Sequence, residues 1–170
     1  MKTFNITAKL LVAGGFLLAA VAARAEIWTT NNVTYSYTVV NGEASIYNNG
    51  NVAVSTSESI VEIPSTLGEE QYPVTSIGNY AFFNCTGLTS VAIPDSVTSI
   101  GYLSFFSCDA LTSVAIPDSV ASIGDLAFYK CGSLTSVTVP DSVFSIGNQA
   151  FCDCSGLTNA VIGSSVTNIK

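Results

Sequence analysis

Four cysteines recur every 23 residues, and this regular spacing raises the question of a built chemical site. They are Cys85, Cys108, Cys131 and Cys154, and a fifth, Cys152, lies outside the series. Regularly spaced thiols can bind zinc, pair as disulfides, act as nucleophiles, or pack as small apolar side chains. The chain contains no histidine, so the usual serine and cysteine triads lack their imidazole base. We therefore expect no catalytic residues and no enzymatic activity.

The cysteines belong to a longer repeat with the same period. The repeat unit reads SIGxxAFxxCxxLTSVxIPDSVx, with Ser104 in the alanine place and Gly163 in the proline place. A unit this short cannot cover its own apolar side chains, so the pattern predicts a solenoid in which stacked turns bury them. The expected core ladder consists of the four periodic cysteines together with Phe82, Phe105, Phe128, Phe151, Leu88, Leu111, Leu134 and Leu157.

Each turn is expected to hold two short extended pieces and one helical turn. Residues 90–93 should form a strand with Val91 and Ile93 pointing inward, and the following Pro-Asp-Ser should end that strand in a turn. Residues 97–100 should run inward again. The apolar spacing of NYAFFNC, residues 79–85, predicts one short helical turn on the convex side.

The unit SIGxxAFxxCxxLTSVxIP resembles the BspA-type leucine-rich repeat, a 23-residue class found mainly in secreted and surface proteins of bacteria and some parasitic protists. The resemblance covers the chain from Ile60 to Lys170. It implies a leucine-rich-repeat solenoid, a right-handed β/α-type coil with short parallel strands. For several members it also implies attachment to host or matrix proteins or to other cells, and therefore an extracellular protein or glycan as partner.

The first 25 residues read as a targeting segment. They combine a basic start, an apolar run from Leu10 to Ala23, and a small-x-small site ending at Ala25. This pattern predicts a secretory signal peptide over 1–25, cleaved after Ala25, and hence a secreted or cell-surface location. The apolar run is too short and too interrupted by glycine for a membrane anchor, so we expect no membrane insertion of the mature chain.

The exported chain divides into a cap and a solenoid. Residues 26–59 should form a β-hairpin cap around Asn41-Gly42, which shields the first turn from water. Residues 60–170 should form the solenoid, with a degenerate turn over 60–76 that carries a seven-residue insertion as a loop. Four 23-residue repeats follow from residue 77 and are cut off at 169–170. An uncapped last turn would leave open strand edges, so edge-to-edge self-association is a further expectation.

The charge of the exported chain excludes one class of partner. Removal of the signal leaves two lysines, Lys130 and Lys170, against twelve carboxylates, a formal net charge of −10. Nucleic-acid binding depends on Lys and Arg that neutralise phosphates, so we expect no nucleic-acid partner. Attraction to an anionic membrane surface is disfavoured for the same reason.

The geometry of a solenoid limits what the cysteines can do. Stacked turns place equivalent cysteines about 4.8 Å apart with parallel side chains, whereas a disulfide needs converging Cβ atoms and zinc needs a tetrahedral ligand set. We therefore favour buried thiols and expect no metal site and no cofactor. Disulfides between neighbouring turns stay open as an alternative, because secreted cysteines tend to pair. Cys152 is either a chance replacement of an aromatic residue or an exposed thiol able to form intermolecular links.

Two further sets of residues that recur at the same place in successive repeats could carry chemistry. Asp95, Asp118 and Asp141 could bind calcium, but each follows proline and precedes serine, which favours turn chemistry. A threonine column could order water, as in ice-binding solenoids, but strand propensity and hydroxyl ladders explain it better. Its members are Thr89, Thr112, Thr135 and Thr158.

Partner binding requires side chains outside the core. Phe83, Phe106 and Tyr129 follow the core phenylalanines and are the sharper candidates, since aromatic anchors dominate interfaces; alternatively, they seal neighbouring turns. The outward positions of the strand face are the second set: Ser90, Ala92, Ser113, Ala115, Ser136 and Thr138. The sequence thus predicts a non-catalytic, adhesin-like binding module. The alternative is a structural spacer or self-associating segment of a longer extracellular array.

Overall fold

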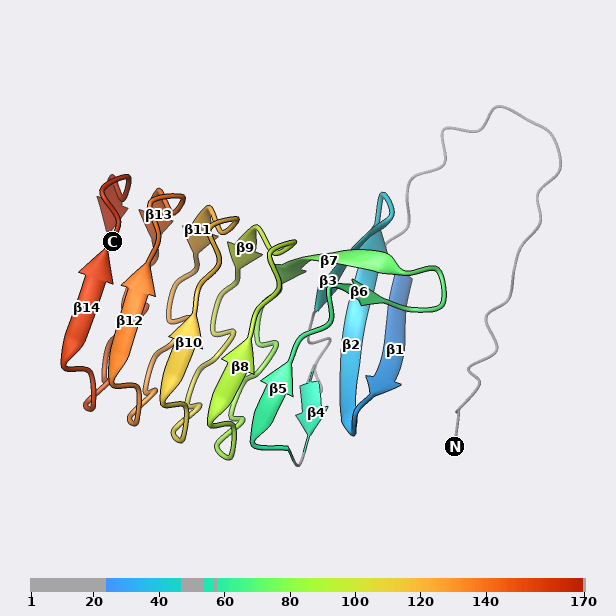
Figure 1. The fold of residues 1–170 in the computed structure, drawn as a ribbon, viewed down its shortest axis with the longest axis horizontal. Helices are drawn as coiled ribbons and strands as arrows, with labels where there is room; N and C mark the ends of the chain where they lie inside the picture. The colour runs from blue at the N-terminus through green and yellow to red at the C-terminus, as the bar shows by residue number, and fades with distance from the viewer. Residues whose placement is uncertain (1–23, 47–53, 57, 170) are drawn as a thin grey trace, which may run out of the picture.

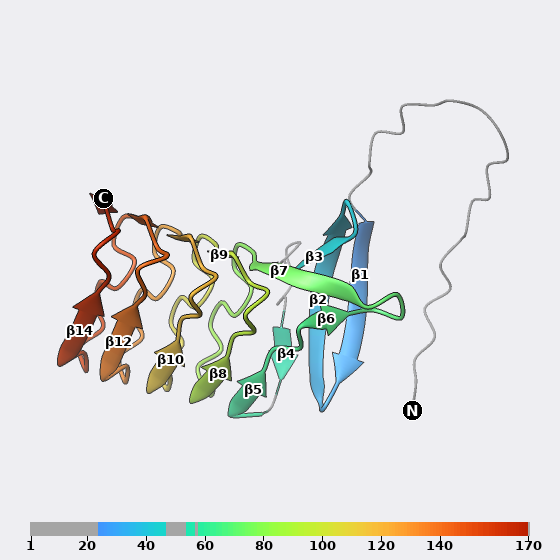
Figure 2. The same cartoon turned by 45° about the horizontal axis from the view of Figure 1, so that its top comes forward.

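The computed structural model describes residues 24–46, 54–56 and 58–169, and there the chain folds into strands and turns. The strands form a stack with a cap at one end and β14 near the other (Figure 1). The view in Figure 2 shows the same order, with β1 and β2 beyond β5 at the cap end. Residues 1–23 of the predicted signal peptide lie outside the described residues.

One ladder of the solenoid is a five-stranded parallel sheet in the order β14-β12-β10-β8-β5. From β8 to β14 neighbouring strands pair with a shift of 23 residues, so that Ser90 lies opposite Ser113 and Ser113 opposite Ser136. The first pairing, of β5 with β8, aligns Val61 with Val91. The strands are β5 (Ile60–Glu62), β8 (Ser90–Ala92), β10 (Ser113–Ala115), β12 (Ser136–Val139) and β14 (Asn159–Ile162).

The second ladder continues from the solenoid into the cap. Its path runs β1-β2-β3-β7-β9-β11-β13-β15, with β4 pairing β2 and β6 pairing β7. The solenoid strands are β7 (Tyr72–Ile77), β9 (Ser99–Ile100), β11 (Ser122–Ile123), β13 (Ser145–Ile146) and β15 (Asn168–Ile169). The others are β1 (Arg24–Thr30), β2 (Val33–Val40), β3 (Glu43–Ile46), β4 (Val54–Thr56) and β6 (Thr66–Leu67).

The cap is built on the hairpin β2–β3. Its turn residues Asn41 and Gly42 have φ of 53° and 82°, the two positive values that a type I′ turn requires. The cap also contains β1, which pairs antiparallel with the whole of β2. Tyr35 and Tyr37 of β2 are fully buried, and Trp28 of β1 packs against the core. These aromatic side chains shield the first turn of the solenoid from water.

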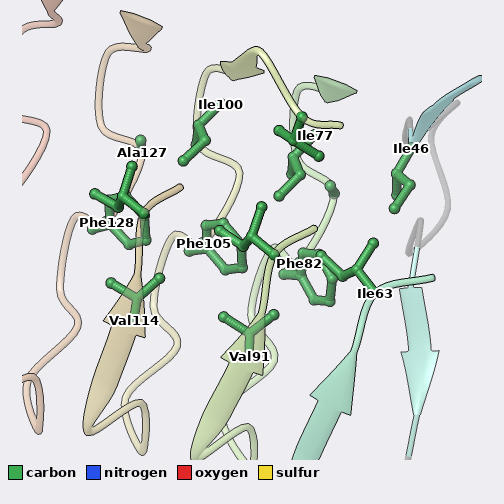
Figure 3. Close-up of a cluster of buried hydrophobic side chains, with 14 of the residues drawn as sticks. Ile46, Ile63, Ile77, Phe82, Val91, Ile100, Phe105, Val114, Ala127 and Phe128 are labelled. Carbon is green, nitrogen blue, oxygen red and sulfur yellow. The ribbon is translucent and has the colours of Figure 1, made fainter. Parts of the chain in front are cut away.

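One strand of the cap also continues the parallel ladder of the solenoid. β3 pairs in parallel with β7 and aligns Ile46 with Ile77, and Ile77 in turn is aligned with Ile100. Figure 3 shows these three isoleucines in one row beside the phenylalanine ladder. Ile46 therefore extends an apolar ladder of the repeats into the cap, although the sequence around it does not follow the repeat.

The inserted segment forms a hairpin where the sequence pattern predicts a loop. β6 and β7 pair antiparallel, with Leu67 opposite Tyr72. The turn between them begins with Gly68, whose φ of 78° lies in the left-handed region. A Cβ on Gly68 would lie 2.7 Å from the Tyr37 hydroxyl, so glycine allows the hairpin to touch the cap. The insertion thus joins the solenoid to the cap.

The prediction of one helical turn per repeat is wrong. No helix is present among the described residues, and 79–85 form successive turns. The N–H groups of Tyr80, Phe82 and Asn84 donate to carbonyls of the next turn, at 2.9, 2.6 and 2.8 Å. The Asn84 N–H, which a helix over 79–85 would need for a bond to the Tyr80 carbonyl, is therefore committed to the next turn. The N–H groups of Phe83 and Cys85 donate to carbonyls three residues earlier, both at 3.2 Å, as in tight turns. The φ values of 60° at Tyr80 and 58° at Asn84 also interrupt any helix.

The core runs along the stack as parallel ladders. The rings of Phe82 and Phe105 are stacked with centroids 4.8 Å apart, and those of Phe105 and Phe128 are 5.0 Å apart. All three rings are fully buried. Figure 3 shows them between the strand side chains Val91 and Val114 on one side and the isoleucine row on the other. Each repeat therefore depends on its neighbours for burial, as expected of a solenoid.

Candidate binding surface

The strand face is smooth and made of small side chains. On β8, β10 and β12 the residues that point away from the core alternate with buried valines. Five of the six candidate positions are exposed, and Ser90 is half-buried; the exposed ones are Ala92, Ser113, Ala115, Ser136 and Thr138. Such a face offers area and hydroxyl groups but no large anchor.

The second aromatic residue of each turn forms a column outside the core. The rings of Phe83 and Phe106 are stacked 4.9 Å apart at 9°, and those of Phe106 and Tyr129 are 5.4 Å apart at 6°. All three are half-buried, in contrast to the fully buried inner ladder. The ammonium of Lys130 lies 5.6 Å from the centre of the Tyr129 ring. A hydrogen bond to Asp153, with burial and nearby negative charge, raises the pKa of Tyr129.

Two tyrosines that the sequence reasoning missed extend this column. Tyr80 contacts Phe83 edge-on at 5.6 Å between centroids, and it contacts Tyr102 at 5.4 Å and 89°. Tyr80 is 36% exposed and Tyr102 38% exposed. The residue type at both positions differs from repeat to repeat, and this variation in the sequence could have pointed to them. We call the five rings the aromatic surface: Tyr80, Phe83, Tyr102, Phe106 and Tyr129.

The periodic cysteines act as hydrogen-bond donors inside the stack. The thiol of Cys108 donates to the Phe82 carbonyl at 3.2 Å, that of Cys131 to Phe105 at 3.3 Å, and that of Cys154 to Phe128 at 3.1 Å. Each bond joins one turn to the turn before it. The structure describes all five cysteines, and no disulfide forms between them. The same carbonyls also accept the backbone N–H groups of Cys85, Cys108 and Cys131, so each thiol adds a second bond, between turns, to an acceptor that is already paired.

Three of the four thiols of the ladder are poor nucleophiles, whereas a hydrogen bond with Cys131 lowers the pKa of the fourth, Cys154. Burial raises the pKa of Cys85 to about 11. Burial raises the pKa of Cys108, and a hydrogen bond with Cys154 together with burial raises that of Cys131. Because the thiolate is the reactive species, these groups are inert at neutral pH. Cys108 and Cys131 are fully buried, whereas Cys85, Cys154 and the off-ladder Cys152 are half-buried.

The aspartate column lies in tight turns. The N–H of Val97 donates to the Pro94 carbonyl at 3.0 Å, and the same bond recurs at Val120 and Val143. In the last turn the Asp141 carboxylate accepts the Ser164 N–H at 2.6 Å. In the part of the chain that the structure describes, no group of three His, Cys, Asp or Glu side chains is placed to hold a metal ion. Each aspartate holds an exposed position directly after proline in one of these turns, a place that aspartate commonly occupies.

The threonine column bonds between turns in the same way. The hydroxyl of Thr112 donates to the Thr89 carbonyl at 3.1 Å, that of Thr135 to Thr112 at 3.3 Å, and that of Thr158 to Thr135 at 3.2 Å. The hydroxyl protons are thus used inside the protein, as a hydroxyl ladder. This leaves the aromatic surface as the most distinctive feature outside the core.

Parallel ladders of 23-residue turns around phenylalanine and leucine define a leucine-rich-repeat solenoid. Residues 69–170 match the model of the BspA type leucine rich repeat region in six copies. The chain belongs to this family, in agreement with the resemblance seen in the repeat unit. No curated protein matches the chain.

Solved structures of bacterial leucine-rich repeat proteins share the fold. One from Bacteroides capillosus is 29% identical, with a TM-score of 0.66 over 80% of this chain and 97% of its own. One from T. pallidum is 30% identical, with a TM-score of 0.69 over 79% and 61%. A leucine rich cell surface protein from Faecalibacterium prausnitzii is 29% identical, with a TM-score of 0.60 over 84% and 44%. The chain therefore spans less than two thirds of the latter two proteins.

Proposed function

We propose that the protein is a non-catalytic, adhesin-like binding module that acts outside the cell and recognises a partner protein through its aromatic surface. The observation that carries the proposal is the exposure of that surface: five rings form one chain of contacts, yet all five stay partly accessible to solvent. Buried aromatic residues supply a large share of the energy at protein interfaces. Membership of a family with cell-surface relatives supports the same function.

Ring orientation favours a protein over a glycan as partner. A sugar ring binds an aromatic side chain by lying flat on its face. Both faces of Phe106 are covered, by Phe83 on one side and Tyr129 on the other, so the column presents ring edges to solvent. Ring edges suit apolar and aromatic side chains, which also pack edge-to-face. The strand face, with its small side chains, is the second candidate for contact.

Export is part of the proposal. The predicted signal peptide would release the chain after Ala25, and a location at the cell surface or in the medium follows. None of the described residues belongs to a helix long and apolar enough to cross a membrane. Mass measurement of the protein recovered from the medium checks this step, with Glu26 as the expected first residue.

A second candidate function is self-association within an extracellular array. On the last described turn Ile162 is 42% exposed and Ile169 is 68% exposed, whereas their equivalents Val139 and Ile146 are 1% and 4% exposed. β14 and β15 end the two ladders among the described strands. Open apolar edges favour pairing with another chain. Concentration-dependent sedimentation that Ile162→Asp abolishes would favour this function.

The main test is capture of extracellular proteins and glycans by the immobilised full chain. We expect saturable protein binding that the double variant Phe106→Ala and Tyr129→Ala weakens at least ten-fold. The control variant Ala115→Gln alters the strand face and should bind as the parent does. Circular dichroism must show that each variant is folded at the assay temperature. Capture of glycans alone, or equal binding by the aromatic variant, would contradict the proposal.

A further inference from the structure

Tyr102 departs from the other residues of its column, and the departure removes a bond between turns. The equivalent residues are Asn79, Asp125 and Asn148. The Asn79 side-chain oxygen accepts the Tyr102 N–H at 2.9 Å, and the Asp125 carboxylate accepts the Asn148 N–H at 2.8 Å. A tyrosine ring carries no oxygen at that place. At Tyr102 an exposed aromatic ring therefore stands in place of a side chain that would accept a hydrogen bond from the next turn.

Tyr80 shows the same kind of departure one column along. Its equivalents are Leu103, Leu126 and Gln149. Leu103 is 8% exposed and Leu126 is half-buried, whereas Tyr80 is 36% exposed and the polar Gln149 is exposed too. All four residues share a left-handed φ, of 52° to 60°, so the departure of Tyr80 lies in its exposed aromatic side chain. Two neighbouring departures thus place two tyrosine rings in edge-to-face contact at the surface.

The protein already holds one cation on its aromatic surface. Lys130 lies over the ring of Tyr129. The equivalent residues beside Phe83 and Phe106 are Asn84 and Ser107, which carry no charge, and Lys130 is the one basic residue between 58 and 169. A cation on the rings of the first two repeats would therefore have to come from another molecule.

The charge around the tyrosine pair is negative. Asp125 lies in the column of Tyr102, one turn further along. The exported chain as a whole carries a formal charge of −10, from two lysines and twelve carboxylates. Such a charge attracts basic partners and speeds their association. In an edge-to-face pair the edge of one ring covers one face of the other, and Tyr80 and Tyr102 stay 36% and 38% exposed, so part of their ring surface is open to a planar cation.

We propose that the tyrosine pair Tyr80 and Tyr102 binds arginine side chains of the partner protein. The inference rests on the proposed function and names the chemistry of the partner, an arginine-rich segment. The guanidinium is planar and stacks on aromatic faces, while carboxylates nearby offset its charge. Lysine, a compact and strongly hydrated charge, fits the ring faces less well.

The test uses the full chain and three synthetic peptides of equal length. One carries three arginines among glycine and serine, one carries citrulline at those positions, and one carries lysine. Fluorescence anisotropy measures the affinity of each peptide for the chain. The arginine peptide should bind at least about five-fold more tightly than the citrulline peptide, and it should also bind more tightly than the lysine peptide. That ratio corresponds to the cation–π stabilisation of about 1 kcal/mol expected near a surface.

Variants taken from the protein's own repeats locate the site. The double variant Tyr80→Leu and Tyr102→Asn installs residues that other turns carry at these positions, so it should fold and should lose the arginine preference. Phe144→Thr removes an aromatic side chain that is 54% exposed and lies outside the aromatic surface, and it should keep the preference. Equal binding of arginine and citrulline peptides, or a preference that survives in the double variant, would overturn the inference. Either result leaves the proposed function standing if Phe106→Ala with Tyr129→Ala still abolishes capture.

Discussion

Ser104 is the one serine in a column of alanines, and the effect of its buried hydroxyl on stability can be measured. The residue is fully buried, and its hydroxyl has no hydrogen-bond partner among the described residues. The equivalents Ala81, Ala127 and Ala150 fit the same place without a polar group. Ser104→Ala should therefore raise the free energy of unfolding, by about 1 kcal/mol, because it removes an unsatisfied buried hydroxyl. Urea denaturation followed by circular dichroism measures the change.

The mirror substitution is the matched control. Ala127→Ser places the same hydroxyl in the next turn and should lower stability by about 1–3 kcal/mol, the cost of burying an unpaired polar group. If both substitutions shift the unfolding free energy in the same direction, the hydroxyl is not the cause, and the explanation given for Ser104 is wrong.

Cysteine exposure gives a second prediction at the residue scale. Cys108 and Cys131 are fully buried, whereas Cys85, Cys152 and Cys154 are accessible in part. A charged thiol reagent at pH 8 should label Cys152 and Cys154 before the other three, since a hydrogen bond with Cys131 lowers the pKa of Cys154, burial raises the pKa of Cys85 to about 11, and Cys108 and Cys131 are out of reach. Peptide mass mapping over time gives the order. Labelling of Cys108 or Cys131 as fast as Cys152 in the folded protein would contradict the structure.

The close approach of successive turns can be tested on glycine at the scale of the repeat. A Cβ on Gly124 would lie 2.7 Å from the Gly101 carbonyl carbon, because the corners of two turns touch there. Gly124→Ala should destabilise the protein by about 1–3 kcal/mol, as overpacking does elsewhere. Gly87 has open space around it, and Gly87→Ala should have little effect. Equal unfolding midpoints for the two variants would show that the turns are not closely packed.

The strands were predictable at this scale, and the helical turn was not. Val91 and Ile93 alternate with outward residues, as a strand with one buried face requires, and both are buried. Val97 and Ile100, three residues apart, are buried as well. The segment 79–85 has apolar residues at helical spacing too, but its alternate N–H groups, among them that of Asn84, bond to the next turn. Spacing along one repeat carries no information about bonds to the following repeat. The 23-residue period predicts that the turns stack, but the conformation within a turn depends on its hydrogen bonds to the neighbouring turn.

The site was predictable in part for a similar reason. Phe83, Phe106 and Tyr129 could be found because they occupy one place in every repeat. Tyr80 and Tyr102 could not be found by searching for repetition, because they break it, and only the structure brings the two rings together. The cap shows the same limit, since Ile46 joins the isoleucine ladder through the pairing of β3 with β7. Departures from a repeat are the places where sequence periodicity is least informative.

At the scale of the whole molecule, alkaline pH should loosen the cap and the first repeat together. Burial raises the pKa of Tyr35 to about 12 and that of Cys85 to about 11. Both values exceed those of the unfolded chain, about 10 and 8.5–9, so the folded state holds the proton more tightly. Their contribution to stability is complete below pH 8 and is lost as the pH rises through 11 and 12. The melting temperature should therefore fall steadily above pH 9.

The variant Tyr35→Phe separates the two groups. It removes the tyrosine that titrates late and also the hydrogen bond from its hydroxyl to the Glu62 carbonyl, at 3.3 Å. The fall in melting temperature between pH 10 and 12 should become shallower, while the fall between pH 9 and 10 should persist. A melting temperature that is constant up to pH 12 in the parent chain would show that Tyr35 and Cys85 are not buried as described.

The central claim is that the aromatic surface, and not the strand face, binds the partner. The most direct test is an equilibrium titration of the captured partner against the parent chain, Phe106→Ala and Ala115→Gln, at a temperature where all three are folded. An anchor ring contributes about 1–2 kcal/mol at an interface, so Phe106→Ala should weaken binding about five- to thirty-fold, and Ala115→Gln should change it less than about two-fold. The reverse order, with Ala115→Gln the weaker binder, would contradict the account.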